Sequence, residues 1–301
     1  MEHVNLNIDT VKDYCDSFGF TPQHPLVAVV DSTESAAAVI PEYTACWGVY
    51  ALFLKQTKGC TINYGKTTYD YDAGSVVCLA PGQRTHASMT PADAVPRYIG
   101  LVFHPDLLFR TSLAPKMRRY TFFGYESREA LHLSEEEKAD IADCLDRIRK
   151  ELRHPADRFS KHLIVSNIEL MLDYCLRYYS RQFAVREELN AGVMSKLEHL
   201  LDDYMHGSNP CADGIPNVKY FAGRLSISPN YFGDLVKRET GRTAQEFIQD
   251  KMLHHAKNLL LDGCGNVSRT AYALGFQYPQ HFIRFFKRKT GITPKEFISS
   301  N

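Results

Sequence analysis

The chain has 301 residues, with 35 Lys and Arg against 35 Asp and Glu, and 44% of its residues are hydrophobic. This is about twice the length of an average domain, with enough apolar material for a buried core, which excludes a lone small module and a disordered chain. No run of about 18 uncharged apolar residues occurs, and the first residues lack the basic start and apolar stretch of a signal peptide. We therefore expect a cytoplasmic protein with two compact units or one large one.

The segment from Pro25 to Phe103 has the pattern of short β-strands. β-branched and aromatic residues alternate there with polar ones, and turn residues separate the runs. The clearest candidate strands are 26–30, 48–54, 67–71, 75–79 and 98–103. Because many short strands between such turns favour a sandwich or small barrel over a parallel α/β sheet, residues 1–130 are predicted to form a β domain.

From Ser134 onward the spacing of apolar residues is helical. Residues 134–137 have the Ser-x-x-Glu pattern of a capping box, and His154-Pro155 is expected to end this helix. A second helix is predicted from about 161 to 183. The inward stripes are Ile141, Leu145, Ile148 and Leu152 in the first helix, and Leu163, Ile164, Ile168, Met171, Leu172, Cys175 and Leu176 in the second. Such stripes serve internal packing or a subunit interface, so residues 131–190 are predicted to be a helical linker or dimerisation segment.

The remaining part, residues 191–301, contains an internal repeat. Residues 229–248 and 279–298 are identical at 10 of 20 positions with an offset of 50. Upstream, residues 222–227 continue the match to 271–276 with the offset reduced to 49. Such a repeat indicates one supersecondary unit that is used twice.

Each copy of the repeat has the pattern of a helix, a short turn and a second helix. In the second copy, Val267-Ser268 is expected to start the first helix, and Gly275 to supply the left-handed residue of the turn. The next helix begins near Pro279, where a first-turn proline is tolerated. Its inward stripe is Phe282, Phe285 and Phe286, which leaves its polar side chains on the outer face.

Between the copies, residues 244–261 are predicted to form a helix of about 18 residues, about 27 Å long at 1.5 Å per residue. Such a helix can hold two recognition helices about one DNA turn, or about 34 Å, apart. Residues 269–301 carry six basic side chains and one acidic side chain, although the whole chain is neutral. A basic cluster on a short helical segment is typical of proteins that bind the phosphate backbone, and a solvated helix face is the other interpretation.

These motifs resemble the signature of the AraC/XylS family of bacterial transcription regulators. The residues that carry the resemblance are Gly275-Phe276, Pro279-Gln280-His281-Phe282 and residues 285–294, and the match covers about 218–298. It implies an all-α DNA-binding domain with two helix-turn-helix motifs over residues 191–301. It also implies a homodimeric regulator that binds double-stranded promoter DNA, acts through RNA polymerase and responds in some members to a small-molecule effector.

The upstream strands resemble the cupin-like effector domain that many members of this family carry. The expected fold class is therefore α+β. It comprises an N-terminal cupin-like β-barrel or jelly roll over residues 1–130, the helical linker over 131–190, and the C-terminal domain with two helix-turn-helix motifs.

The resemblance also places the recognition helices, at about 228–237 and 279–287. Arg284 is the strongest candidate for a base contact, because a guanidinium pairs bidentately with guanine in the major groove. The expected base contacts are Asn230, Asp234, Gln280, Ile283 and Arg284. The expected phosphate contacts, which set the register of the protein on DNA, are Ser228, Lys237, Arg238, Lys287 and Arg288.

The first copy departs from the family pattern at several positions. Gly233 offers no side chain to a base, and Asp234 is anionic where cations are commoner. Ser226 replaces the usual turn glycine, and in the second copy Thr270 replaces an aliphatic residue. We therefore expect the second copy to contribute more of the affinity for DNA than the first.

A competing interpretation is a cupin-type metal-dependent enzyme or a small-molecule-binding protein. Gly74 and residues 81–86 resemble the second cupin motif, but no His-x-His partner lies between Ile40 and Thr67, and a reactive metal needs three or four fixed ligands. We predict no enzymatic activity, no catalytic residue, no metal and no cofactor. The aromatic residues of the β domain suit a ligand pocket or an ordinary core. The candidate pocket residues are Trp47, Tyr50, Phe53, Tyr64, Tyr69, Tyr71 and His86.

Overall fold

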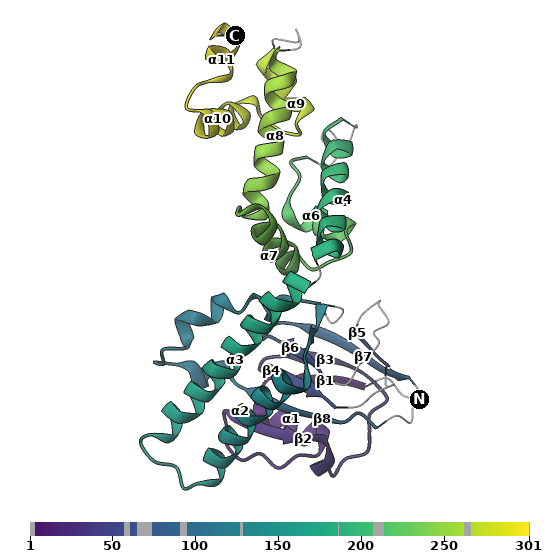
Figure 1. Ribbon diagram of the computed structural model, residues 1–301, viewed down its shortest axis with the longest axis vertical. Coiled ribbons are helices and arrows are strands. Elements are labelled where there is room, and N and C mark those ends of the chain that lie inside the picture. The colour runs from purple at the N-terminus through teal and green to yellow at the C-terminus, as the bar shows by residue number, and fades with distance from the viewer. Residues whose placement is uncertain are drawn as a thin grey trace. The chain divides into compact units, whose positions relative to one another are not determined.

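The computed structural model describes residues 4–56, 61–64, 74–90, 95–126, 129–185, 187–206, 214–261 and 266–300. Its internal contacts divide the chain into two compact units, Met1–Val185 and Arg186–Asn301 (Figure 1). The sequence pattern placed the start of the C-terminal unit slightly later, at residue 191. No helix within these described ranges is long and apolar enough to cross a bilayer.

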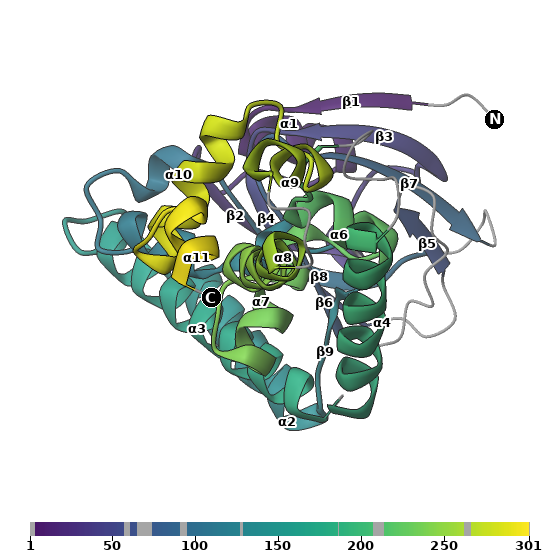
Figure 2. The same cartoon turned by 90° about the horizontal axis from the view of Figure 1, so that it is seen from above.

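The described strands of the first unit form two sheets (Figures 1 and 2). The four-stranded sheet has the order β1 (Val4–Ile8), β3 (Glu42–Trp47), β7 (Arg84–Thr90) and β5 (Thr61–Tyr64). The five-stranded sheet has the order β2 (Val27–Asp31), β8 (Tyr98–Phe103), β4 (Tyr50–Lys55), β6 (Ser75–Leu79) and β9 (Leu131–His132). Neighbouring strands pair antiparallel except β1 and β3, which pair parallel.

The closed barrel expected from the sequence is not found among the described strands. β3 pairs with β7, whereas β4, the next strand along the chain, pairs with β6 and β8, so the chain changes sheets at Gly48. The Gly48 amide donates to the Ile8 carbonyl at 2.8 Å, and a Cβ at residue 48 would lie 2.9 Å from the Asp9 Cα. This close approach requires a glycine. The α+β class is therefore confirmed with two sheets, and the likeness to cupins stays a prediction.

Two long helices, α2 (Glu135–Arg153) and α3 (Ser160–Val185), follow the strands. The predicted capping box forms between Ser134 and Glu137, and His154 caps the C-terminus of α2. Most of the predicted stripes are buried in one core with the five-stranded sheet, so these helices pack internally within the first unit. Leu163 is an exception: it was predicted to face inward, but it is 44% exposed because it lies about 100° around the helix from the buried Ile164.

The five-stranded sheet is buried on both faces. Side chains alternate along β4, so Leu52 and Leu54 join the core under α2 and α3, while Phe53 faces a second core on the other side. That second core also contains residues of the four-stranded sheet and of α1 (Val11–Phe18). Burial on both faces explains why β4 and β6 are almost continuously apolar.

The second unit is helical throughout its described elements. Its helices are α4 (Glu187–His206), α6 (Val218–Arg224), α7 (Pro229–Thr240), α8 (Ala244–Leu261), α9 (Val267–Ala273), α10 (Pro279–Thr290) and α11 (Pro294–Ser300). The predicted central helix is confirmed as α8, which buries Ile248, Met252, Ala256 and Leu260 at helical spacing. Figure 1 shows α7 at one end of α8, with α9 and α10 beside its other half. The second unit therefore has two helix pairs arranged along one central helix.

Candidate nucleic-acid interface

The two helix pairs have the same turn. The first motif is α6 with α7, and the second motif is α9 with α10. Their turn residues Ser226 and Gly275 have positive φ angles of 59° and 82°. The next amide donates back at 3.0 Å in both motifs, from Ile227 to Ala222 and from Phe276 to Ala271. The repeat therefore reproduces the left-handed residue and the hydrogen bond of the turn, and Ser226 adopts the left-handed conformation that glycine adopts at lower cost.

Matching residues end the two recognition helices α7 and α10. Each helix ends at a left-handed glycine, Gly241 or Gly291, whose amide donates to the carbonyl of a lysine four residues earlier. Upstream of α10, the N-cap of α9 differs from the prediction. Asn266 caps α9, because its side chain accepts from the amides of Ser268 and Arg269. Ser268 therefore lies inside the first turn and does not cap the helix.

The outer face of α10 is polar and largely cationic. Gln280, Arg284, Lys287 and Arg288 are exposed, and their spacing of four, three and one residues places them on one side of the helix. Ile283 is half-buried at the edge of the core. The opposite side is buried through Phe282, Phe285 and Phe286. The predicted contacts of the second motif thus share one accessible surface.

The outer face of α7 is less cationic. Asn230, Lys237 and Arg238 are exposed, and Gly233 and Asp234 are half-buried. A Cβ at Gly233 would meet nothing within 4 Å, so packing within the chain does not require this glycine. The first motif therefore has two cations near the C-terminus of its recognition helix and small or anionic residues in the middle of it.

Ser228 does not fit its predicted role. Its side chain is 2% exposed, and its Oγ accepts from the Tyr231 amide at 3.1 Å, so it caps the N-terminus of α7. A hydroxyl that is buried in a cap is not presented to a phosphate. The predicted phosphate contact of the Ser228 side chain is therefore wrong.

Asp250 on α8 links the two motifs. Its carboxylate accepts from Arg242 Nη1 at 2.7 Å and from Lys289 Nζ at 3.1 Å. Arg242 follows the recognition helix of the first motif, and Lys289 belongs to that of the second. One carboxylate of the central helix thus binds the second recognition helix and the segment that follows the first, and Lys289 is engaged within the protein.

Two reciprocal capping pairs start the helices that follow α7 and α10. Thr243 and Glu246 exchange hydrogen bonds at the start of α8, and Thr293 and Glu296 do so at the start of α11. The threonine backbone amides are the main cause of a lowered pKa at both glutamates. Both carboxylates are therefore ionised at neutral pH and accept the capping hydrogen bonds in both copies of the repeat.

A shallow groove beside α10 adds residues that the sequence reasoning missed. Gln249 and His281 line it together with Arg284 and Arg288. Amide, imidazole and guanidinium groups all donate hydrogen bonds, so this groove is a further surface suited to an anionic backbone. The helical spacing along α8 could have indicated that Gln249 is accessible, because it lies beside the stripe of buried residues that contains Met252.

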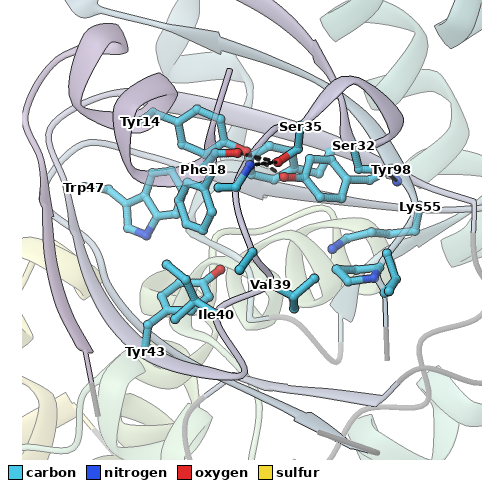
Figure 3. Close-up of a pocket in the computed structure, with 15 residues that line it drawn as sticks. Tyr14, Phe18, Ser32, Ser35, Val39, Ile40, Tyr43, Trp47, Lys55 and Tyr98 are labelled. Carbon is cyan, nitrogen blue, oxygen red and sulfur yellow. Dashed lines mark hydrogen bonds between the residues drawn. The ribbon is translucent and has the colours of Figure 1, made fainter. Parts of the chain in front are cut away.

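The first unit contains a cavity of about 170 Å³ between α1, the segment 32–40 and strands β3, β4 and β8 (Figure 3). Of the predicted pocket residues, Trp47 and Phe53 line it. The full lining is Tyr14, Phe18, Ser32, Ser35, Ala37, Ala38, Val39, Ile40, Tyr43, Trp47, Phe53, Lys55, Val95, Pro96 and Tyr98. The Tyr14 and Tyr98 hydroxyls are 3.1 Å apart, and burial raises the pKa of Tyr98. The cavity is thus lined mainly by aromatic and aliphatic side chains, with hydroxyls and one amine in its wall.

The other predicted pocket residues do not line this cavity. Tyr50 stacks on Phe103, with ring centroids 5.0 Å apart, on the opposite face of the five-stranded sheet. His86 points to the outer face of the four-stranded sheet, since its neighbour Ala87 is buried, and its Nε2 lies 3.6 Å from a Glu42 carboxylate oxygen. The Tyr64 side chain, Tyr69 and Tyr71 lie outside the described residues.

The described residues show no group of three or more His, Cys, Asp and Glu side chains that could hold a metal ion. The predictions of no metal, no cofactor and no enzymatic activity stay predictions.

Comparison with known proteins identifies the fold of the second unit. The profile of a protein family described as a helix-turn-helix domain matches residues 221–300. The uncharacterized HTH-type transcriptional regulator YobQ of Bacillus subtilis (strain 168) is 30% identical over 142 residues, which cover 43% of this chain and 58% of YobQ. The uncharacterized transcriptional regulatory protein YesN of the same organism is 34% identical over 112 residues, which cover 36% of this chain and 28% of YesN.

Among solved structures, the C-terminal domain of the two-component response regulator yesN from Fusobacterium nucleatum subsp. nucleatum is similar with a TM-score of 0.32 and 22% identity. That similarity covers 36% of this chain and 98% of the other. The residues matched in the two Bacillus subtilis proteins cover less than two thirds of the length of YobQ and of YesN.

Proposed function

We propose a mode of action from one premise: through its C-terminal domain, the chain belongs to the AraC/XylS family of DNA-binding transcription regulators. In this proposal α7 and α10 enter two adjacent major grooves of promoter DNA. The bound protein then regulates transcription initiation through RNA polymerase.

The exposed face of α10 carries this proposal. Gln280, Arg284, Lys287 and Arg288 share one side of a helix whose opposite side is buried in the domain core. A side chain such as Arg284 can donate two hydrogen bonds to guanine, and Gln280 can pair in the same way with adenine. Lys287 and Arg288, at the C-terminal end of the helix, then bind phosphates and fix the register.

The first motif binds in the same orientation with fewer base contacts. Lys237 and Arg238 occupy the positions that Lys287 and Arg288 occupy in the second motif, so they bind the corresponding phosphates. Asn230 reads a base edge, and Asp234 accepts from a cytosine amine. Because α7 lacks a cation in its middle, the second motif contributes more of the affinity.

The first unit regulates this activity. Its cavity, which is lined mainly by aromatic and aliphatic side chains, is of a size that admits a small-molecule effector. The protein acts as a homodimer, in which the outer side of α3, with Leu163 and Leu170 each 44% exposed, supplies the subunit contact. A dimer would place four helix-turn-helix motifs on one promoter and would raise the affinity without any new contact within one chain.

A genomic binding experiment tests the proposed function. The purified full chain is mixed with sheared DNA from its own organism, and retained fragments are sequenced. We expect enrichment of a shared sequence motif, loss of that motif with Arg284→Ala, and no change with Arg158→Ala, which removes an exposed arginine of the first unit. Retention without a shared motif, or equal behaviour of the two variants, would contradict the proposal.

A further inference from the structure

We infer that the Tyr278 hydroxyl binds a DNA phosphate beside the second recognition helix, and that the ring of His281 holds Tyr278 in place for this contact. The inference rests on the proposed function, because it adds one contact to the interface between α10 and DNA. Three observations carry it: the N-cap of α10, the exposure of the Tyr278 side chain, and the side of the helix on which His281 lies.

Tyr278 occupies the position where a helix normally begins with a capping side chain. It is the N-cap residue of α10, and its side chain makes no capping hydrogen bond. The corresponding residue of the first motif, Ser228, caps α7 by accepting from the Tyr231 amide at 3.1 Å. Serine is among the best N-cap residues, and large side chains without a short polar group are poor ones. Tyr278 thus breaks a local rule that the first motif keeps, and such exceptions are expected at functional sites.

The Tyr278 side chain is exposed but supported. It is 59% exposed, and its hydroxyl has no hydrogen-bond partner among the described residues. Its ring centroid lies 5.6 Å from that of His281, with the ring planes 75° apart, which is a favourable edge-to-face arrangement. Because this contact restricts the ring before DNA is bound, less side-chain entropy is lost when the hydroxyl forms a hydrogen bond.

His281 places Tyr278 on the side of α10 that faces phosphates. His281 and Arg288 are seven residues apart, so they lie within about 20° of each other around the helix, and both line the groove beside α10. Gln280, which we assign to a base, lies about 100° around the helix from His281. Because Arg288 is assigned to a phosphate, a hydroxyl beside His281 faces the backbone at the wall of the major groove. Tyrosine hydroxyls are regular donors to phosphate oxygens.

A neutral donor has effects on binding that differ from those of a cation. Its hydrogen bond to a charged phosphate oxygen adds affinity for every DNA sequence. A phenol does not neutralise the phosphate and releases no counterion, so it does not contribute to the dependence of affinity on salt. Tyr278 should therefore differ from Lys287 and Arg288 in its salt effect, and from Arg284 in its indifference to sequence.

Anisotropy titrations of the full chain at several salt concentrations test the assignment. The two probes are a fragment from the genomic selection and unrelated DNA. Tyr278→Phe, which removes only the hydroxyl, should weaken binding to both about fivefold to twentyfold, with an unchanged slope of log affinity against log salt. Tyr272→Phe, at a tyrosine of α9 that is 52% exposed, should leave both affinities unchanged. Unchanged affinity in Tyr278→Phe, or a loss confined to the selected fragment, overturns the inference.

DNA with one methylphosphonate at a time locates the contact. Each methylphosphonate replaces a charged oxygen of one phosphate by a methyl group. At the phosphate that Tyr278 binds, this replacement should weaken the wild-type protein more than Tyr278→Phe, by about the factor that the variant itself loses on unmodified DNA. At the other phosphates both proteins should lose affinity equally. Equal losses at every position overturn the inference.

Tyr278→Ser tests whether weaker binding reflects a damaged helix. Serine can cap α10 as Ser228 caps α7, so this variant should bind DNA no more tightly than Tyr278→Phe while its fold is more stable. Hydrogen exchange of the amides in residues 279–290 should slow about fivefold. Faster exchange together with weaker DNA binding would overturn the inference, because the loss would then follow from the helix and not from the hydroxyl.

The same preparations separate this inference from the proposed function. A protein that selects a shared DNA motif equally well with Tyr278→Phe overturns the phosphate contact and leaves the proposed function intact. A wild-type protein that selects no shared motif, but loses affinity for all DNA with Tyr278→Phe, overturns the proposed function and leaves the phosphate contact intact.

Discussion

Replacing Lys287 by Ala should weaken binding to every DNA sequence by a similar factor and reduce its sensitivity to salt. Lys237, Arg238, Lys287 and Arg288 are the four exposed cations that we assign to phosphates. Each neutralised phosphate contributes about −0.9 to the slope of log affinity against log salt, so the four contacts of one chain bound to its own site predict a slope of about −3.6. An increase from about 50 to about 200 mM salt then lowers the affinity about 150-fold, and only about 40-fold without Lys287.

Fluorescence anisotropy with a labelled fragment from the genomic selection measures these slopes. Arg284→Ala is the matched comparison, since it removes a cation from the same face of α10. It should cost about 1 to 3 kcal/mol on the selected sequence and little on unrelated DNA, because a base contact discriminates between sequences. A wild-type slope for Lys287→Ala, or a loss confined to the selected sequence, would refute the assignment of Lys287 to a phosphate.

Three further predictions concern the frame of the second unit. Ser226→Gly should stabilise it by about 0.5 to 1 kcal/mol and Gly275→Ala should destabilise it by about 1 to 2 kcal/mol in denaturant unfolding, because both positions are left-handed. The pKa of Glu246 and of Glu296 is lowered in the folded protein, so their contribution to the free energy of unfolding is complete above the usual glutamate pKa of about 4.3 and is lost as the pH falls through the lower folded value. Replacing both by Gln should therefore flatten the dependence of stability on acid pH. An unchanged pH dependence below about pH 4.3 would contradict this prediction. Asp250→Asn should destabilise the unit by about 0.5 to 1 kcal/mol, because Asp250 loses its charge toward Arg242 and Lys289. It should also weaken binding to a DNA fragment that contacts both motifs more than binding to a shorter fragment that contacts one motif. Anisotropy titrations with these two fragments measure the difference.

The second unit could be predicted closely because its sequence contains two copies of one structure. Two copies define each boundary twice, so the central helix was located to the residue, and both recognition helices begin within one residue of the predicted start, although they end three residues after the predicted end. The errors are local choices between adjacent capping residues. Asn266 and Ser268 are both good N-cap residues, and the pattern could not show that the buried Val267 already belongs to the first turn of α9.

The first unit was harder to predict because its sheets and its cavity are formed by residues that lie far apart in the sequence. β7 has a mostly polar sequence that gives little strand signal, and β1 reaches its partner β3 across more than 30 residues. The cavity unites Tyr14, Tyr43, Lys55 and Tyr98 from four separate elements. No spacing in the sequence connects them, whereas Trp47 and Phe53 could be proposed simply because they are aromatic residues near predicted strands.

The differences between the two motifs concern their predicted base contacts and not their predicted phosphate contacts. Five positions that build the frame are identical in both copies: the first-turn proline, one buried phenylalanine, the glycine that ends the helix and the capping Thr and Glu. The two cations assigned to phosphates are identical as well. The outward positions assigned to bases all differ, with Asn230, Gly233 and Asp234 in α7 against Gln280, Ile283 and Arg284 in α10.

A duplicated unit that kept its frame and its phosphate contacts would dock both copies on the duplex in the same way. Only the side chains that face the base edges would then distinguish them. Exchange of the three outward residues of α7 for those of α10 should therefore leave the fold and the salt slope nearly unchanged while the sequence selected at the first groove becomes that of the second. A swapped protein that selects the original sequence would show that the first motif contributes no base readout.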